Sequence, residues 1–360
     1  MKLIIRSPGP LTTVQDLGRW GYQAIGMPVS GAMDAPALTR GNILLGNPDN
    51  AAGLEMTMMG ATVIFRDGEG AIAITGGDLQ PKLNGQPVPN WTVLAVKHDD
   101  VLSFGGVCGR GFRAYLCVTG GIDVPVVMGS RSTYMKAKIG GLEGRKLTQD
   151  DELVTGQAGI FKAGISCPEN LRPDYSGNKP LRTVLGPQDD HFKPEGIKTF
   201  LSAEYKISSS SDRMGTRMEG QEIIEHLKGP DIVSDAIPMG AVQIPGQGLP
   251  IVMMADRQTT GGYVKIGVVH ALDVARLSQF MPGSPVKFSE ITQKQGIEIS
   301  KAESQALNAL RTHVTESLNS KEAINPAPAQ TVPQTQAQSG AMNVIVNGEK
   351  FFVTWEKLSS

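Results

Sequence analysis

Residues 251–268 read IVMMADRQTTGGYVKIGV, in which two short apolar runs flank a polar segment that contains two glycines. Apolar runs of this length, bounded by Gly, Pro or Asp, are typical of β-strands. Similar runs occur at 62–65, 71–75, 92–96, 113–118 and 183–185. Gly accounts for 43 of the 360 residues and Pro for 23, which disfavours a bundle of long helices. We therefore expect a mainly β protein with few helices.

Three helices are predicted from capping signals and apolar spacing. Asp34 is placed to N-cap a helix that runs towards Leu45, with Pro36 in its first turn. A second helix is predicted over 273–280. Ser300 and Glu303 have the spacing of a capping box, which predicts a third helix that begins there. Its apolar face would comprise Leu307, Leu310, Val314 and Leu318.

Two lobes in tandem are suggested by a weak internal repeat. Residues 30–33 resemble 211–214, and 72–78 resemble 251–256, both at an offset of roughly 180 residues. We expect a first β lobe over 1–175 and a second over 181–319, which includes the C-terminal helix. A Pro/Ala/Gln linker is predicted over 320–340. A β-hairpin with an Asn347-Gly348 turn is predicted within 341–360.

Composition excludes several classes of function. Lys and Arg number 34 against 35 Asp and Glu, so there is no excess of positive charge for nucleic acid. No apolar run reaches the roughly 18 residues that a membrane helix needs. The three cysteines form no disulfide framework or metal-binding pattern, and we expect a cytoplasmic protein without a metal site. No P-loop, zinc-hydrolase or serine-hydrolase motif occurs.

Polar residues are instead concentrated in five glycine-containing loops, at 12–21, 30–34, 129–134, 211–217 and 255–263. Guanidinium groups and hydroxyls in loops of a β protein are typical of a pocket for a small polar or anionic ligand. Each loop also has a structural interpretation. Asp16 and Arg19 could form an ion pair within a turn, and Asp34 could act only as an N-cap.

The order of these segments resembles the family formed by the C subunit of 5-oxoprolinase, also called KipA or allophanate hydrolase subunit 2. It also resembles one half of the carboxyltransferase domain of biotin-dependent urea carboxylase. The resemblance covers residues 3 to about 300. The matching segments are 15–19, 30–34, 46–48, 54–55, 129–134, 140–141, 144–145, 186–188, 211–215 and 257–263.

The resemblance implies two tandem cyclophilin-like β-barrel lobes and a partner, the KipI-like B subunit of 5-oxoprolinase. Together with the A subunit, the complex would use ATP to open 5-oxoproline to glutamate. ATP would be bound in the complex, since this chain has no P-loop, and no biotin would be attached because no biotinylation sequence occurs. Two alternatives remain: a biotin-dependent carboxyltransferase subunit that acts on urea or a related amide, and a non-catalytic KipA-type antagonist of a kinase inhibitor.

A lactam carbonyl must be activated before it can be hydrolysed, and phosphorylation of its oxygen would achieve this. Charge would then develop on oxygen atoms, which Arg side chains and N–H donors stabilise. The candidate catalytic residues are Arg131, Arg213 and Arg257 as clamps and Asp16 and Asp256 as bases. The candidate substrate-binding residues are Gln15, Arg19, Asp34, Ser132, Thr133, Tyr134, Thr259, Thr260, Gly261, Gly262 and Tyr263.

Overall fold

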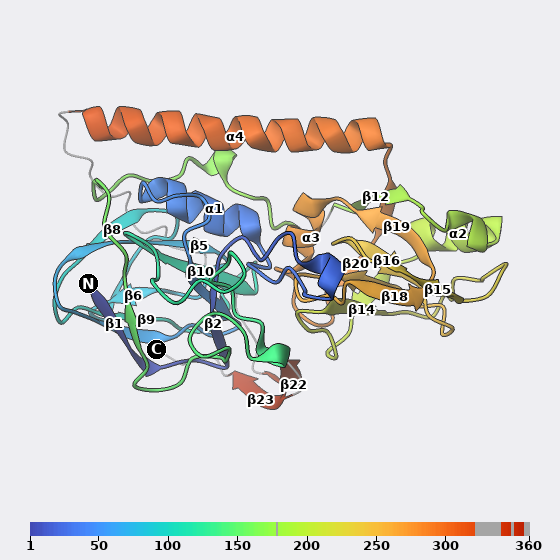
Figure 1. Ribbon diagram of the computed structural model, residues 1–360, viewed down its shortest axis with the longest axis horizontal. Coiled ribbons are helices and arrows are strands. Elements are labelled where there is room, and N and C mark those ends of the chain that lie inside the picture. Colours follow the sequence, from blue (N-terminus) through green and yellow to red (C-terminus); the bar gives the residue numbers. More distant parts are fainter. Residues whose placement is uncertain (178, 321–339, 347–348, 356–360) are drawn as a thin grey trace.

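The computed structural model describes residues 1–177, 179–320, 340–346 and 349–355. Two β lobes lie side by side, and a long helix crosses over both of them (Figure 1). Each lobe has its own apolar core, and a third cluster packs between the first lobe and the long helix. The predicted mainly β architecture is confirmed.

The first lobe consists of two antiparallel sheets that pack around buried Leu3, Leu54, Phe65, Ile72 and Leu116. The six-stranded sheet has the order β11 (Glu152–Val154), β1 (Lys2–Ser7), β4 (Thr62–Arg66), β9 (Val101–Ser103), β6 (Lys82–Leu83), β7 (Gln86–Pro87). The five-stranded sheet has the order β2 (Leu11–Gln15), β3 (Gly53–Thr57), β10 (Arg113–Val118), β5 (Gly70–Gly76), β8 (Val93–Val96). All of β2, β3, β5 and β10 is buried, so polar residues on these strands need partners inside the protein.

The second lobe is built on an eight-stranded sheet whose core includes the contacting rings of Phe200, Tyr205 and Phe288. Its order is β20 (Pro285–Val286), β13 (Tyr205–Ile207), β14 (Gly215–Glu219), β17 (Ile251–Met253), β16 (Ala241–Gln243), β19 (Lys265–Val269), β12 (Leu181–Leu185), β21 (Phe288–Glu290). A separate two-stranded ribbon pairs β15 (Asp231–Ala236) with β18 (Thr260–Tyr263).

The α-helices are α1 (Ala35–Leu44), α2 (Pro194–Ser202), α3 (Ala271–Leu277) and α4 (Gln293–Asn319). Short 3-10 helices occur at Gln23–Ile25, Met135–Ala137, Glu169–Leu171 and Asp189–His191. The predicted N-cap of α1 is confirmed, since Oδ1 of Asp34 accepts a hydrogen bond from the Ala37 amide. The second helix was predicted over 273–280. It begins two residues earlier and ends three residues earlier than predicted, because His270 is its N-cap.

The predicted start of the long helix at Ser300 is wrong. Thr292 and Gln295 form the capping box, and Ser300 lies inside α4. The Thr-x-x-Gln pattern at 292–295 has the same capping-box spacing and lies eight residues earlier, so the helix already includes Ser300. The helix was expected to belong to the second lobe, but its distal half packs Leu310 and Val314 into the third cluster, against the first lobe.

One of the matched pairs of the predicted repeat differs in local structure, whereas 72–78 and 251–256 both contain strands, β5 and β17. Residues 30–33 lead into helix α1, whereas the similar residues 211–214 lead into strand β14. Strands β22 (Gly340–Val346) and β23 (Glu349–Trp355) pair in antiparallel fashion, as predicted for the hairpin. The Asn347-Gly348 turn and linker residues 321–339 lie outside the described residues. Among the helices of the described segments, none has the length and apolar character needed to cross a membrane.

Candidate active site

Four of the five predicted polar loops, and the start of the fifth, meet where the two lobes touch. The backbone N–H of Asp16 in the first loop donates to Oγ of Ser132 in the third, at 3.0 Å. Arg213 in the fourth loop donates to the Gly31 carbonyl in the second, at 2.6 Å, and to Asp256 in the fifth. The resulting lobe-junction cluster comprises Asp16, Glu55, Ser132, Arg213 and Asp256.

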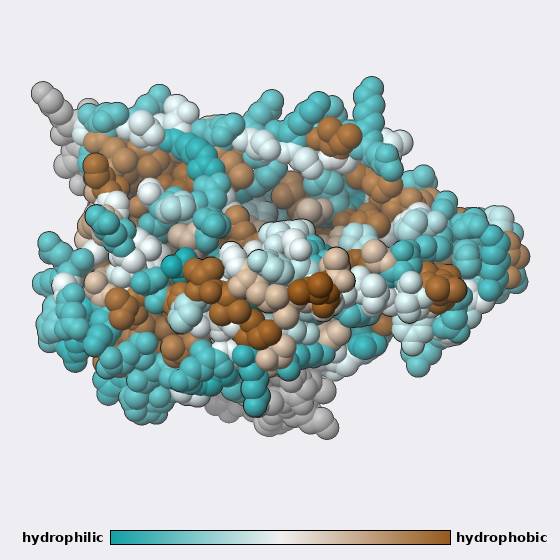
Figure 2. All heavy atoms as spheres, in the orientation of Figure 1, coloured by the Kyte–Doolittle hydropathy of each residue, from teal (hydrophilic) through white to brown (hydrophobic). Residues whose placement is uncertain are grey.

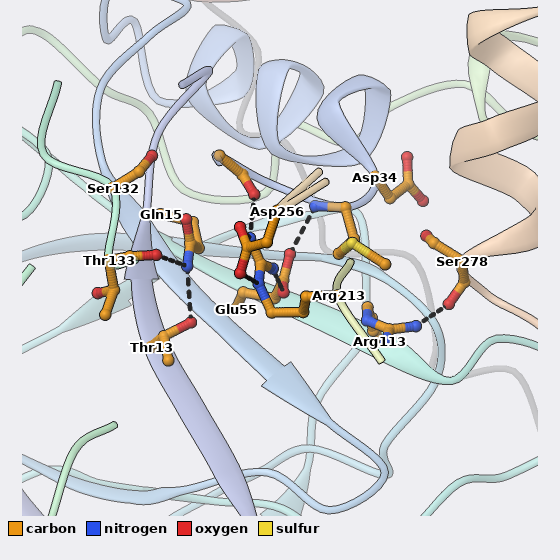
Figure 3. Close-up of polar contacts among 12 residues, drawn as sticks. Thr13, Gln15, Asp34, Glu55, Arg113, Ser132, Thr133, Arg213, Asp256 and Ser278 are labelled. Atoms are coloured by element: carbon orange, nitrogen blue, oxygen red, sulfur yellow. Dashed lines mark hydrogen bonds and ion pairs between the residues drawn. The ribbon is translucent and has the colours of Figure 1, made fainter. Parts of the chain in front are cut away.

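Arg213 lies at the centre of the lobe-junction cluster (Figure 3). Its Nε and Nη2 donate to the two carboxylate oxygens of Asp256 at 3.0 and 3.1 Å, and its Nη1 donates to Glu55. Burial alone would lower the pKa of Arg213, but the carboxylates of Asp256 and Glu55 raise it above its ordinary value. Two carboxylates therefore already compensate the charge of Arg213. The side chain links the two lobes and is not an unpaired cation that could bind a substrate.

Glu55, on β3, connects Arg213 to the first lobe. Its Oε2 accepts hydrogen bonds from the hydroxyl of Tyr115 at 2.7 Å and from the amide of Met33 at 2.8 Å. The Tyr115 hydroxyl in turn accepts from the amide of Asp34 at 2.7 Å. Burial raises the pKa of both Tyr115 and Asp34. Sequence reasoning did not select Glu55 as a site residue, although a carboxylate within a buried strand was a usable signal.

Asp16 is held by donors from the third loop. Its carboxylate accepts from Oγ of Ser130 at 2.7 Å, from Oγ of Ser132, and from the amides of Gly18 and Arg131 at 2.8 and 2.6 Å. These donors occupy both carboxylate oxygens. Asp16 thus fixes the shape of the third loop.

The predicted Asp16–Arg19 ion pair does not form in the described structure. Arg19 instead donates to the carbonyls of Ser132 at 2.7 Å and Val127 at 3.2 Å, while the carboxylate of Asp16 is bound by donors of the third loop. Burial lowers the pKa of Arg19, against the attraction of Asp16 and Asp256. The Nη1 atom of Arg19 is buried without a hydrogen-bond partner.

Two further predicted residues, Gln15 and Tyr134, lie around this cluster, whereas the side chain of Arg131 does not. Gln15 donates to Thr13 and to the carbonyl of Thr133, while its buried Oε1 has no partner. Tyr134 is partly buried, and burial followed by the charge of Asp256 raises its pKa. Arg131 is not brought into the cluster, since its side chain turns to Asp123 at 2.9 Å near the surface.

In the fifth loop, Asp256 belongs to the lobe junction, whereas the residues after it lead into the ribbon. The predicted residues Thr260, Gly261, Gly262 and Tyr263 form β18, with Thr259 directly before it. Gly261 pairs with Asp235 of β15. These residues therefore lie with a different set of polar groups from those at the lobe junction.

Arg257 lies at the base of this ribbon and, like Arg19, is a buried arginine without an ion pair among the described residues. It is 6% exposed, and it donates to the carbonyls of Ile237 at 3.0 Å and Met254 at 3.3 Å. No carboxylate of the described residues pairs with it. Burial lowers its pKa to about 10. A buried cation without a counter-ion is costly, so this arrangement suits an anionic or partly negative ligand group.

Unsatisfied amides lie near Arg257. The Nε2 of Gln243 and the Oε1 of Gln258 are buried without a partner. A Cβ at Gly261 would lie 2.6 Å from the Cδ1 of Ile237 and 3.1 Å from Nε2 of Gln243, so a larger residue there would displace these side chains. We call Gln243, Arg257, Gln258 and Gly261 the ribbon-base cluster. It offers both a donor and an acceptor, as an amide ligand requires.

Lys265 adds another polar group beside the ribbon. Its side chain is fully buried, and its Nζ contacts Oδ2 of Asp235 at 3.0 Å. Sequence reasoning missed Lys265 and Gln243. The available signal was a polar residue within an otherwise apolar strand, VKIGV or AVQI.

Comparison with known proteins gives the class to which this fold and site belong. The family described as carboxyltransferase domain, subdomain A and B, matches residues 25–290, and the chain belongs to this family. The chain is 38% identical to the C subunit of 5-oxoprolinase from Escherichia coli, over 83% of this chain and 94% of that protein. It is 36% identical to the C subunit of the Haemophilus influenzae enzyme, over 84% of this chain and 96% of the relative. The predicted family resemblance is confirmed.

Longer proteins contain a similar region. The crystal structure of Kluyveromyces lactis urea amidolyase superimposes on this chain with a TM-score of 0.80 and a sequence identity of 30%. The match covers 86% of this chain and 20% of that one. For K. lactis urea carboxylase the TM-score is also 0.80, at 27% identity, over 96% of this chain and 32% of that one. The chain thus spans only a fifth to a third of these two structures.

Proposed function

We propose that this protein is the C subunit of an ATP-dependent 5-oxoprolinase, which acts with a KipI-like B subunit and with the A subunit to convert 5-oxoproline to glutamate. The observation that carries the proposal is the 38% identity that extends over 94% of the C subunit of E. coli 5-oxoprolinase. The similarity to urea amidolyase of Saccharomyces cerevisiae, at 33%, extends over 17% of that protein.

Within this proposal, the ribbon-base cluster receives the lactam. Arg257 is the cation best placed to stabilise negative charge on the carbonyl oxygen, because no carboxylate of the described residues competes for it. Gln243 and Gln258 orient the ring amide through their unpaired amide groups. The lobe-junction cluster, with Asp16 and Arg213, holds the surrounding loops in register. ATP supplies the phosphoryl group that activates the carbonyl.

A second candidate function is that of a carboxyltransferase subunit that acts with biotin on urea or a related amide. The TM-score of 0.80 to K. lactis urea carboxylase favours it. Unpaired amides and an uncompensated guanidinium suit a ureido group as well as a lactam. This function would require a biotin carboxylase and a biotin carrier in the same assay.

The test is co-purification with the KipI-like homologue, followed by an ATP-dependent 5-oxoproline assay after addition of the A subunit. Turnover would support the proposal. A stable complex without turnover would contradict it and favour the antagonist role. Carboxylation of urea by the complex with a biotin carrier would favour the second candidate.

Variants of Arg257 sharpen this test. Arg257→Ala should lower turnover well over tenfold, because one charge-stabilising donor contributes about 10²–10³-fold in rate. Arg257→Lys retains the charge and should be impaired less. Arg131→Gln is the matched control, since Arg131 is a partly exposed residue turned away from both clusters. Equal turnover of Arg257→Ala and the control would refute the role of Arg257.

A further inference from the structure

A cavity of about 380 Å³ lies between the lobes on the side covered by α4. Its wall combines α1, α3, α4 and two parts of the segment that connects the lobes, residues 170–175 and 179–180. The surface is hollowed below the side chains of α4, and hydrophilic residues lie in the hollow (Figure 2). Sites for small organic molecules have volumes of roughly 300–1000 Å³, so the cavity can hold a metabolite.

The wall of this cavity is dominated by charge. Its charged side chains are the basic Arg40, Arg172, Lys179, Arg182 and Arg276 and the acidic Asp34, Asp174, Asp273 and Glu303. Three ion pairs consume most of them: Arg40–Glu303, Lys179–Asp174 and Arg182–Asp273. The cations left without a dedicated counter-ion among the described residues are Arg172 and Arg276.

Arg276 is 7% exposed, and its Nη2 donates to the carbonyl of Pro180 at 2.7 Å. Asp273 lies 3.5 Å away, but Arg182 already holds both of its oxygens at 2.8 and 2.9 Å. The Nε of Arg276 is buried without a partner. A buried guanidinium with an unused donor in a cavity wall points to a ligand that accepts a hydrogen bond.

Arg172 contributes the second cation. Its Nε donates to the carbonyl of Cys167 at 2.9 Å, which fixes the direction of the guanidinium. Among the described residues, its two terminal nitrogens make no hydrogen bond to an oxygen atom, and the guanidinium also lies beside the Cys167 thiol. Paired terminal nitrogens of arginine bind carboxylate and phosphate groups in bidentate fashion.

The cavity adjoins the lobe-junction cluster through Asp34. This residue lines the cavity and accepts hydrogen bonds from Tyr175 at 2.7 Å and Gln279 at 2.8 Å. Its backbone amide donates to Tyr115, which donates to Glu55. A ligand in the cavity would therefore contact the same network that holds Arg213.

We propose that this cavity is a binding site for a small organic anion, held through its carboxylate or phosphate group between Arg172 and Arg276. The site lies apart from the ribbon-base cluster, and it requires neither the KipI-like partner nor ATP. It goes beyond the proposed function, because it applies to the chain alone.

Isothermal titration of the full chain tests this site, with L-glutamate and sodium phosphate as separate probes at constant ionic strength. We expect saturable binding of at least one probe, and the probe that binds identifies the ligand group as carboxylate or phosphate. Arg172→Gln should weaken binding about tenfold or more, the effect of one lost charge-assisted contact. Arg276→Lys retains the charge but loses Nε, and it should also weaken binding.

Arg6→Gln is the matched control, since Arg6 is an exposed arginine on β1 of the first lobe. Its affinity should equal that of the unmodified chain. Absence of saturable binding with both probes would overturn the proposal, as would equal affinities in Arg172→Gln and the control. Because the titration uses this chain without its proposed partners, its outcome is independent of the 5-oxoprolinase assay.

Discussion

At the scale of single residues, buried arginines at the lobe junction and the ribbon base differ in how their charge is compensated. Arg213 is bound by two carboxylates, whereas Arg257 is bound by backbone carbonyls alone. A compensated cation contributes to structure, and an uncompensated one is available to a ligand. The sequence pattern treated both as equivalent clamps, and only the positions of Glu55 and Asp256 separate them.

Replacement of Glu55 should therefore affect stability. Glu55→Ala leaves Arg213 with one carboxylate and removes the acceptor of the Tyr115 hydroxyl. We expect a loss of about 3–5 kcal/mol in the free energy of unfolding, as for other broken buried ion pairs. Glu55→Gln keeps an acceptor and should lose less. Urea denaturation measures both, and an unchanged midpoint for Glu55→Ala would contradict the structural role.

The cysteines give a pH-dependent prediction. Burial raises the pKa of the Cys117 thiol to about 12 and that of Cys167 to about 11. A raised pKa keeps a thiol protonated, and the thiolate is the reactive form, so both should resist alkylation at neutral pH. Cys108 is only partly buried and should react with iodoacetamide first, faster as pH rises. Peptide mass spectrometry identifies the labelled residue, and urea-unfolded protein, in which all three react, is the control.

At the scale of secondary structure, Asp34 both caps a helix and accepts hydrogen bonds from side chains of other segments. It N-caps α1, and its other carboxylate oxygen accepts from Tyr175 and Gln279. Asp34→Ala removes all three acceptor contacts and should cost about 2–3 kcal/mol of stability, whereas Asp34→Asn retains the cap and should cost less. Thermal unfolding would reveal the difference. An unfolding temperature of Asp34→Ala equal to that of the unmodified protein would mean that the Asp34 side chain contributes nothing.

Strands and the first helix could be predicted from sequence because their signals are local. The apolar run at Arg113–Val118 forms β10 with those bounds, and Asp34 caps α1. The start of α4 was misplaced because two capping patterns compete, at Thr292 and Ser300, and only packing decides between them. Glu55 and Lys265 were missed because their partners lie far away in sequence. A polar residue in an apolar strand signals that a partner is needed, but it does not show which distant residue provides it.

At the scale of the whole molecule, α4 connects the lobes through contacts with both of them. Its first turns meet His270 of the second lobe, and further along Glu303 binds Arg40 of α1 through two hydrogen bonds, at 2.6 and 3.0 Å.

The Arg40 side chain is only 3% exposed, so Glu303→Ala would leave a buried cation without its counter-ion. We expect a loss of about 2–4 kcal/mol in urea denaturation, within a single transition for both lobes. Lys301→Ala on the same helix removes only an exposed pair with Glu298 and should change stability by about 0.5 kcal/mol or less. Equal effects of the two substitutions would show that α4 does not hold the lobes together through this pair.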